Sequence, residues 1–194
     1  MKKIFLGINV LLAVVFFYRA SFAQSPYTIK FDSVSQVEGG ISVASTCYVK
    51  SLKVRMELRA QDQETVFIMD GQNSYMYFPS SKVAISIPVQ QASGQVPVPT
   101  SYKEIPGLTK VGQEEVNGKP CDVYEYNEKG NHHKIWVDKE IDFPIKSESM
   151  TGRGKVVNYI SNVQKNISLE DSLFKLPADA QVMDQKTMEG MGNY

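Results

Sequence analysis

The chain has 194 residues, of which 42% are hydrophobic and 22% charged, with 21 basic and 21 acidic side chains. A chain of this length predicts a single domain. The balanced charge, which becomes −3 once residues 1–23 are removed, argues against nucleic acid, or an anionic membrane surface, as the main partner.

The N-terminus has the features of a secretory signal peptide. Lys2 and Lys3 precede an apolar run over residues 4–17, and small residues follow at positions 21 and 23. This pattern predicts a signal peptide over residues 1–23, and the run is too short for the alternative, a membrane anchor. Cleavage after Ala23 would leave 171 residues with 18 basic and 21 acidic side chains, a net charge of −3. We therefore expect an exported protein without a transmembrane span, in the periplasm or, as the alternative, outside the cell.

The strongest local signal is the unbroken alternation of charged and apolar residues over 53–60. Period-two patterns place one set of side chains on each face of a sheet. Similar patterns predict further strands at residues 27–32, 43–50, 65–69, 74–78 and 83–87. Asp70-Gly71 supplies the positive-φ positions of a tight hairpin. The first half is therefore expected to be an antiparallel meander with one apolar and one polar face.

Residues 88–106 differ in composition from the rest of the chain, because they contain four prolines and almost no charge. Proline at this density breaks helices and central strands. The segment is predicted to be a long surface loop. It is either a linker between two halves of one sheet or a flap over it.

Strand patterns resume in the second half, at residues 112–116, 121–126, 134–138, 143–148 and 155–162. Asn117-Gly118 predicts a type I′ turn. Ser168, followed three residues later by Asp171, predicts the start of a single helical turn. Residues 181–194 are expected to form a flexible tail.

Cys47 and Cys121 are the only cysteines of the chain. An even count in an exported protein favours a disulfide between them. On chain-entropy grounds such a bridge would stabilise the fold by roughly 4–5 kcal/mol. The alternative is a pair of inert buried thiols, and a redox role is disfavoured because the sequence has no Cys-x-x-Cys motif.

Four segments carry a resemblance to a known group of proteins. Residues 134–146 look like a hairpin typical of periplasmic outer-membrane lipoprotein carriers. Residues 166–177 are similar to their C-terminal signature, where a phenylalanine tucks under the sheet before a proline. Residues 115–121 fit the turn before their central strands, and residues 48–57 look nearer to an uncharacterised exported branch of that superfamily, a domain of unknown function. Together these segments span most of residues 43–180.

The resemblance implies that residues 24–180 form a mainly β fold, a single antiparallel meander curved into an unclosed half-barrel with few short helices. It also implies a partner: the concave face would hold a lipid, a lipoprotein acyl chain or another apolar ligand, in the manner of a carrier or chaperone. The carriers line their cavity with helices, including one at the N-terminus. Here Gln24 leads almost directly into a strand, so no carrier residue is transferred.

The alternation assigns one set of apolar side chains to the inward face of the meander. The candidate ligand-binding residues are Val54, Met56, Leu58, Phe67, Met69, Met76, Val83 and Ile85. Methionine repacks around varied ligands, which favours a binding cavity, and an ordinary packed core is the alternative. A second hypothesis is a non-enzymatic interaction or sensor module with a packed core. Such a module would bind another envelope protein through a sheet edge or the Pro-rich loop.

No catalytic or metal-binding constellation stands out in the sequence. It lacks Gly-x-Ser-x-Gly and His-Glu-x-x-His motifs. Glu114 and Glu115 are consecutive and therefore point to opposite faces of a strand. His132 and His133 are expected in a solvated turn, pointing in opposite directions, where they do not share a metal ion. We therefore expect no enzymatic activity, no metal and no cofactor.

Overall fold

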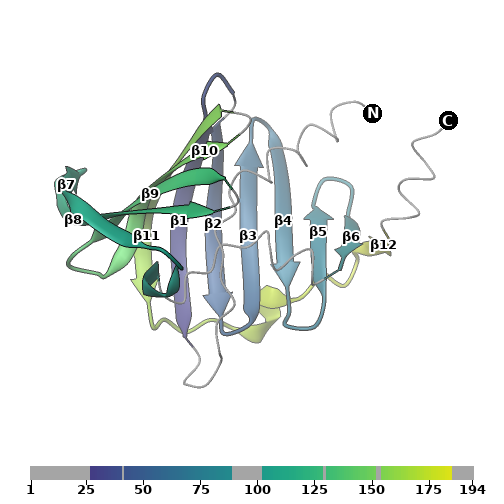
Figure 1. The fold of residues 1–194 in the computed structure, drawn as a ribbon. Coiled ribbons are helices and arrows are strands. Elements are labelled where there is room, and N and C mark those ends of the chain that lie inside the picture. Colours follow the sequence, from purple (N-terminus) through teal and green to yellow (C-terminus); the bar gives the residue numbers. More distant parts are fainter. Residues whose placement is uncertain (1–26, 41, 89–101, 129, 152–153, 185–194) are drawn as a thin grey trace. The chain divides into compact units, whose positions relative to one another are not determined.

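The computed structural model describes residues 27–40, 42–88, 102–128, 130–151 and 154–184 (Figure 1). The predicted signal peptide, most of the Pro-rich loop and the tail from residue 185 onward lie outside these ranges. Within them the chain consists mainly of strands. Neither of the two short helices in the described residues has the length or the apolar composition of a membrane span.

The described chain divides into two compact units. The first unit contains residues 33–42 and 102–161, and the second contains residues 27–32, 43–88 and 162–184. The first six strands are β1 (Thr28–Val37), β2 (Ser42–Lys50), β3 (Lys53–Ala60), β4 (Gln63–Met69), β5 (Ser74–Phe78) and β6 (Val83–Ile87). The later ones are β7 (Thr109–Val116), β8 (Lys119–Glu128), β9 (Asn131–Asp138), β10 (Phe143–Thr151), β11 (Gly154–Lys165) and β12 (Gln181–Met183). The two 3₁₀ helices are η1 (Tyr102–Glu104) and η2 (Asp171–Phe174).

The strands are hydrogen-bonded in the order β12-β6-β5-β4-β3-β2-β1-β11-β10-β9-β8-β7. The sheet is not closed, because β12 and β7 each have a single neighbour. The predicted mainly β, unclosed fold with few short helices is thereby confirmed. The order adds one feature that the sequence did not predict: two meanders, β1–β6 and β7–β11, are joined where β1 lies beside β11.

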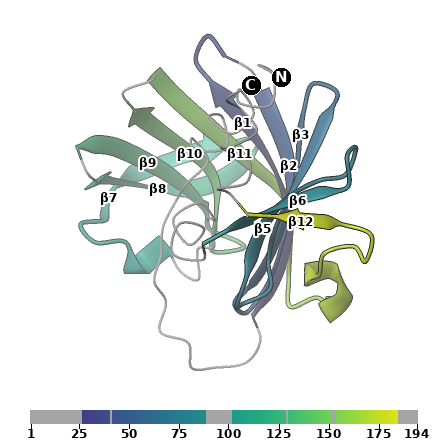
Figure 2. The ribbon, with the colours of Figure 1, turned by 90° about the vertical axis from the view of Figure 1, so that its right-hand side faces the viewer.

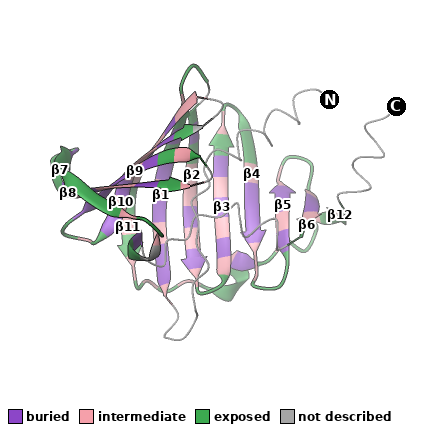
Figure 3. Cartoon of the chain, viewed as in Figure 1, coloured by how far each residue is buried: buried purple, intermediate pink, exposed green. Residues whose placement is uncertain are grey.

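In the second unit, β2 to β6 pair antiparallel in the register that the alternation predicts. Met56 in β3 lies opposite Cys47 in β2 and Phe67 in β4. Along β3, Val54, Met56 and Leu58 are buried, whereas the residues between them are half-buried (Figure 3). The apolar positions of the pattern are therefore the ones withdrawn from water.

The last strand, β12, pairs with β6 in parallel (Figure 2). The Gln181 amide donates to the carbonyl of Lys82 at 2.8 Å, and Met183 lies opposite Ile85. The sequence places residues 181–183 at the start of a flexible tail, whereas the structure places them in the sheet.

The two predicted turns have different outcomes. The type I′ turn is confirmed, because Asn117 and Gly118 have φ values of 52° and 78° and connect β7 directly to β8. The tight hairpin at Asp70-Gly71 is wrong, since residues 70–73 form a longer connection. There the carboxylate of Asp70 accepts hydrogen bonds from the amides of Gln72 (2.9 Å) and Asn73 (2.8 Å).

In the first unit, the end of the Pro-rich segment packs on the sheet. Tyr102 in η1 is buried against Tyr126, Ile135 and Val137 of β8 and β9. Its hydroxyl donates to the carboxylate of Asp142 at 2.7 Å. The part of the predicted loop from residue 102 is therefore anchored to its own unit, while residues 89–101 lie outside the described chain.

Candidate functional site

One face of the second unit gathers all eight predicted ligand-binding residues. Residues directly opposite each other on paired strands project to the same face. The register forms an unbroken row from Cys47 through Met56, Phe67 and Met76 to Ile85. The other four predicted residues lie two positions along a strand from a member of this row, and therefore project to the same face. We call this surface the methionine face, and its members are Val54, Met56, Leu58, Phe67, Met69, Met76, Val83 and Ile85.

The methionine face is apolar, and its described residues include no charged side chain. Six of the eight members are buried, while Met69 and Val83 are half-buried. A polar residue on the same face, Ser74, is satisfied because its hydroxyl donates to the carbonyl of Ile87 at 2.6 Å. The row from β2 to β6 crosses four interstrand spacings, a length of about 19 Å. The face is therefore a continuous row of uncharged side chains, and its described residues offer no acid–base pair.

Two side chains at the ends of this row, Cys47 and Met183, were not predicted as ligand-binding residues. Cys47 lies opposite Met56, and Met183 lies opposite Ile85. Cys47 could have been found, because it follows the alternation of its own predicted strand. Met183 could not, because a three-residue strand carries no readable period.

The opposite face of the same strands is covered by the chain's own C-terminal segment. Val66, Ile68, Tyr77 and Ala84 form a buried cluster on that face, and the residues packed against them are Leu176 and Ala180. Phe174, the residue that the resemblance expects to tuck under the sheet, is 1% exposed. The C-terminal segment is therefore part of the packing of this opposite face.

Lysine side chains hold this segment in place. Lys50 donates to the carbonyl of Leu169 at 2.7 Å, and both Lys50 and Lys53 pair with Asp171, at 3.0 and 2.9 Å. Hydrogen bonds from Lys53 and then Lys50 lower the pKa of Asp171. The predicted helical turn is present as η2, but it begins at Asp171 and receives no side-chain cap, so the capping role expected of Ser168 is wrong.

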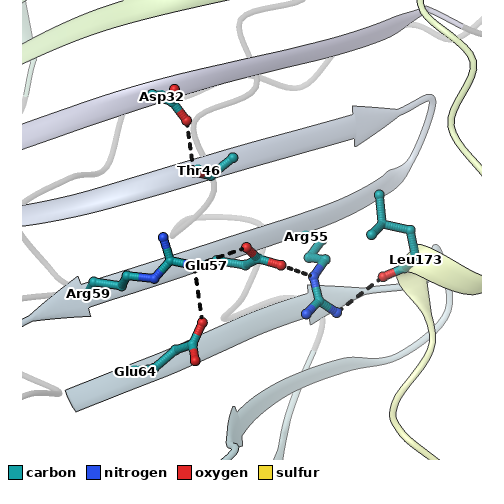
Figure 4. Close-up of polar contacts among 7 residues, drawn as sticks. All are labelled: Asp32, Thr46, Arg55, Glu57, Arg59, Glu64 and Leu173. Atoms are coloured by element: carbon teal, nitrogen blue, oxygen red, sulfur yellow. Dashed lines mark hydrogen bonds and ion pairs between the residues drawn. The ribbon is translucent and has the colours of Figure 1, made fainter. Parts of the chain in front are cut away.

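A charged cluster lies beside η2 on the covered face (Figure 4). The Arg55 guanidinium contacts Glu57 at 2.7 Å and donates to the carbonyl of Leu173 at 3.3 Å. Arg59 lies 3.7 Å from Glu57 and 3.5 Å from Glu64. Each carboxylate of this cluster thus has an arginine partner. We interpret it as a structural network that fixes η2 on β3.

Asp32 links three strands within the second unit. Its carboxylate accepts hydrogen bonds from the Thr46 hydroxyl and the Asn162 amide, both at 2.8 Å (Figure 4 shows the Thr46 contact). The bond from Asn162, followed by that from Thr46, lowers the pKa of Asp32. These contacts are structural, because they tie β1 to β2 and β11.

The predicted disulfide is not formed. Cys47 and Cys121 are both buried free thiols. Cys47 lies opposite Met56 in the second unit, while Cys121 lies in the first unit between Glu114 and Asp138 on the neighbouring strands. Burial raises the pKa of Cys47 to about 12 and also raises the pKa of Cys121. The structure therefore agrees with the alternative expectation, a pair of inert buried thiols.

Trp136 is buried in the first unit at 2% exposure. Its indole N–H donates to Glu114 at 2.7 Å, and the ammonium groups of Lys146 and Lys134 lie 3.9 and 4.7 Å from the ring centroid. The hydrogen bond from Trp136, then that from Lys134, lowers the pKa of Glu114. Trp136 is therefore part of the first unit's packing.

The two histidines lie in β9, which corrects the predicted solvated turn. His132 is 3.4 Å from Glu125, whereas His133 is 6% exposed, stacks on Tyr126 and lies 3.0 Å from the Ser149 hydroxyl. Burial, followed by the charge of His132, lowers the pKa of His133. Adjacent strand positions point to opposite faces, which separates the rings. Among the residues with a described placement, no three His, Cys, Asp or Glu side chains are grouped to hold a metal ion.

These features define a class of protein: an unclosed, mainly antiparallel sheet domain with an uncharged apolar face on one of its units. The chain belongs to the family described as "Domain of unknown function (DUF4412)", which it matches over residues 33–142. Membership of a domain of unknown function, which the sequence predicts, is thereby confirmed. A search of the curated proteins found no match.

Among the similar solved structures, the first described here shows the same kind of fold. An uncharacterized conserved protein from Thermus thermophilus is similar with a TM-score of 0.62 at 12% identity, over 95% of this chain and 98% of that one. A chain of the Pseudomonas aeruginosa MucA/MucB complex has a TM-score of 0.49 at 15% identity, over 81% of this chain and 58% of that one. The Mycobacterium tuberculosis lipoprotein LppX has a TM-score of 0.47 at 12% identity, over 74% and 88%. At 12% identity, the similarity to the Thermus thermophilus protein concerns the fold alone.

Proposed function

We propose that this protein is exported to the cell envelope and binds a lipid, a lipoprotein acyl chain or another apolar ligand on the methionine face, without catalysing a reaction. The observation that carries the proposal is the in-register row from Cys47 to Ile85, which crosses five strands with uncharged side chains. The signal-peptide pattern of residues 1–23 supports export.

The energetics of apolar burial fit such a surface. Each buried methylene contributes about 0.8 kcal/mol, so roughly ten methylenes supply about 8 kcal/mol, the free energy of a micromolar Kd. Ordering the ligand and the side chains subtracts from this total. The thioether side chains of Met56, Met69 and Met76 can adapt to acyl chains of different shape.

The first test places a carboxylate on the methionine face. Met56→Glu or Ile85→Glu should abolish retention of a 16-carbon fatty acid, because a ligand cannot solvate the buried charge. The matched control is Leu52→Glu, which puts the same charge on an exposed residue (47%) of the second unit. Circular dichroism checks that each variant is folded. Normal binding by both face variants would show that the ligand lies elsewhere.

An ordinary packed core is the competing account, and it makes a different prediction. On that account the wild-type protein takes up no fatty acid, and both glutamate variants unfold. Export is tested separately, by N-terminal sequencing of the protein from the envelope fraction. The proposal requires the mature chain to begin at Gln24.

A further inference from the structure

Strand β7 is an edge of the sheet with an open outer side. It is the last strand in the sheet order, and seven of its eight residues are exposed. Edge strands present a row of backbone N–H and C=O groups that can pair with another strand. The other edge, β12, has three residues. Among the described strands, β7 is therefore the longer edge.

The hairpin to β8 determines which backbone groups of β7 point outward. The turn at 117–118 makes Val116 and Lys119 the closing pair, which is hydrogen-bonded in a two-residue type I′ hairpin. Hydrogen-bonded and non-hydrogen-bonded pairs alternate along an antiparallel ladder. The next pair, Glu115 and Pro120, is therefore non-hydrogen-bonded.

The contacts of Pro120 agree with this assignment. Proline has no N–H to donate to β7, and the carbonyl of Pro120 accepts a hydrogen bond from the Lys139 amide on the far side of β8, at 3.1 Å. The N–H and C=O of Glu115 accordingly point away from β8. By the same alternation the backbone groups of Gln113 also point outward, while those of Glu114 point toward β8.

A β-bulge brings the two charged ends of β7 onto one face. The register shifts between Lys110 and Gly112, so Val111 is the extra residue. In a regular strand Lys110 and Glu115, five positions apart, would point to opposite faces. Because the bulge adds one residue, Lys110 and Glu115 instead lie on the same face as Gln113. The backbone N–H and C=O groups of all three residues point away from β8.

We infer that β7 pairs with β7 of a second copy of this chain, antiparallel about a two-fold axis at Gln113. In this register Gln113 faces its counterpart, and Lys110 of each copy lies opposite Glu115 of the other. Within the described part of the chain the Glu115 carboxylate has no partner, whereas Lys110 pairs with Asp122 at 2.7 Å. The second copy supplies a cation for Glu115. The contact is isologous, so it closes as a dimer.

Charge reversal tests this register. Native mass spectrometry and sedimentation equilibrium of the mature protein should show a dimer that Glu115→Lys or Lys110→Glu each weakens by about tenfold or more, since like charges then face each other. An equimolar mixture of the two variants should form a heterodimer of wild-type affinity, because each Lys then faces a Glu. The matched control is Glu140→Lys, an exposed position in the turn after β9, which should leave the dimer intact.

Proline substitution tests the backbone pairing. Gln113→Pro removes the N–H at the two-fold axis, and an edge strand tolerates proline, so the variant should remain folded as a monomer. Hydrogen exchange at the Glu115 amide should slow with protein concentration, whereas exchange at the Glu114 amide should not depend on it. A wild-type monomer at every concentration, or a dimer unaffected by Gln113→Pro, overturns the inference. The inference is also overturned if the β7 amides are protected from exchange only when an extended peptide of another protein binds.

Discussion

Alanine truncation of Met76 and of Ile68 should separate ligand binding from folding, because the two residues lie on adjacent strands and opposite faces. Met76 belongs to the methionine face and is 6% exposed. Ile68 is fully buried in the cluster that packs against Leu176 and Ala180. Each truncation leaves a cavity and should lower the free energy of unfolding by about 2–5 kcal/mol. Most domains of this size retain a folded majority after such a loss.

Only the truncation of Met76 should change ligand affinity. Removing its side chain beyond Cβ deletes roughly 2 kcal/mol of apolar contact, which corresponds to about thirtyfold in Kd. The assay is a titration with a fluorescent 16-carbon fatty acid, with urea unfolding of both variants in the same buffer. Equal Kd values for Met76→Ala and the wild type would refute the assignment of the face. A thirtyfold loss of ligand affinity in Ile68→Ala would mean that ligand affinity depends on the stability of the fold and not on contact with the methionine face.

Three further predictions concern buried groups. Phe174→Ala should lower the free energy of unfolding by about 3–5 kcal/mol in urea, because the side chain is 1% exposed; a change below about 1 kcal/mol would contradict its anchoring role. Without reductant, alkylation should label neither cysteine in the native protein and both after unfolding, because both thiols are buried and free and the pKa of Cys47 is about 12. If the unfolded protein also resists labelling, the two cysteines form a disulfide after all. Because the pKa of His133 is lowered, the unfolded chain binds a proton that the folded chain does not, so stability present near pH 7 should decline below about pH 6.5. His133→Phe should make the free energy of unfolding less dependent on pH in this range. An unchanged pH dependence would show that His133 is not the group responsible.

The sequence predicted the faces of the second unit because period-two alternation leaves little freedom. Once residues 53–60 form a strand, Val54, Met56 and Leu58 must share a face, and antiparallel pairing brings Phe67 and Met76 beside them. The Asn117-Gly118 turn was equally readable, because few other residue pairs adopt two successive positive φ values.

Pairings between distant strands could not be read from the same patterns. Alternation predicts the face on which a side chain lies but does not determine which strand is the neighbour. The position of β1 beside β11 was therefore not predicted from the sequence. The histidines were misplaced for a related reason: a polar composition suggested a turn, yet stacking on Tyr126 buries His133 within β9. The disulfide was expected from the compartment and the cysteine count alone, and neither identifies the residues opposite Cys47 or Cys121.

The most direct test of the proposed function is native mass spectrometry of the mature protein, residues 24–194, purified gently from the envelope. The account predicts additional mass that extracts into organic solvent and that Met56→Glu loses. A clean mass without ligand, together with no uptake of added fatty acid or phospholipid, would contradict it and identify the methionine face as a packed core.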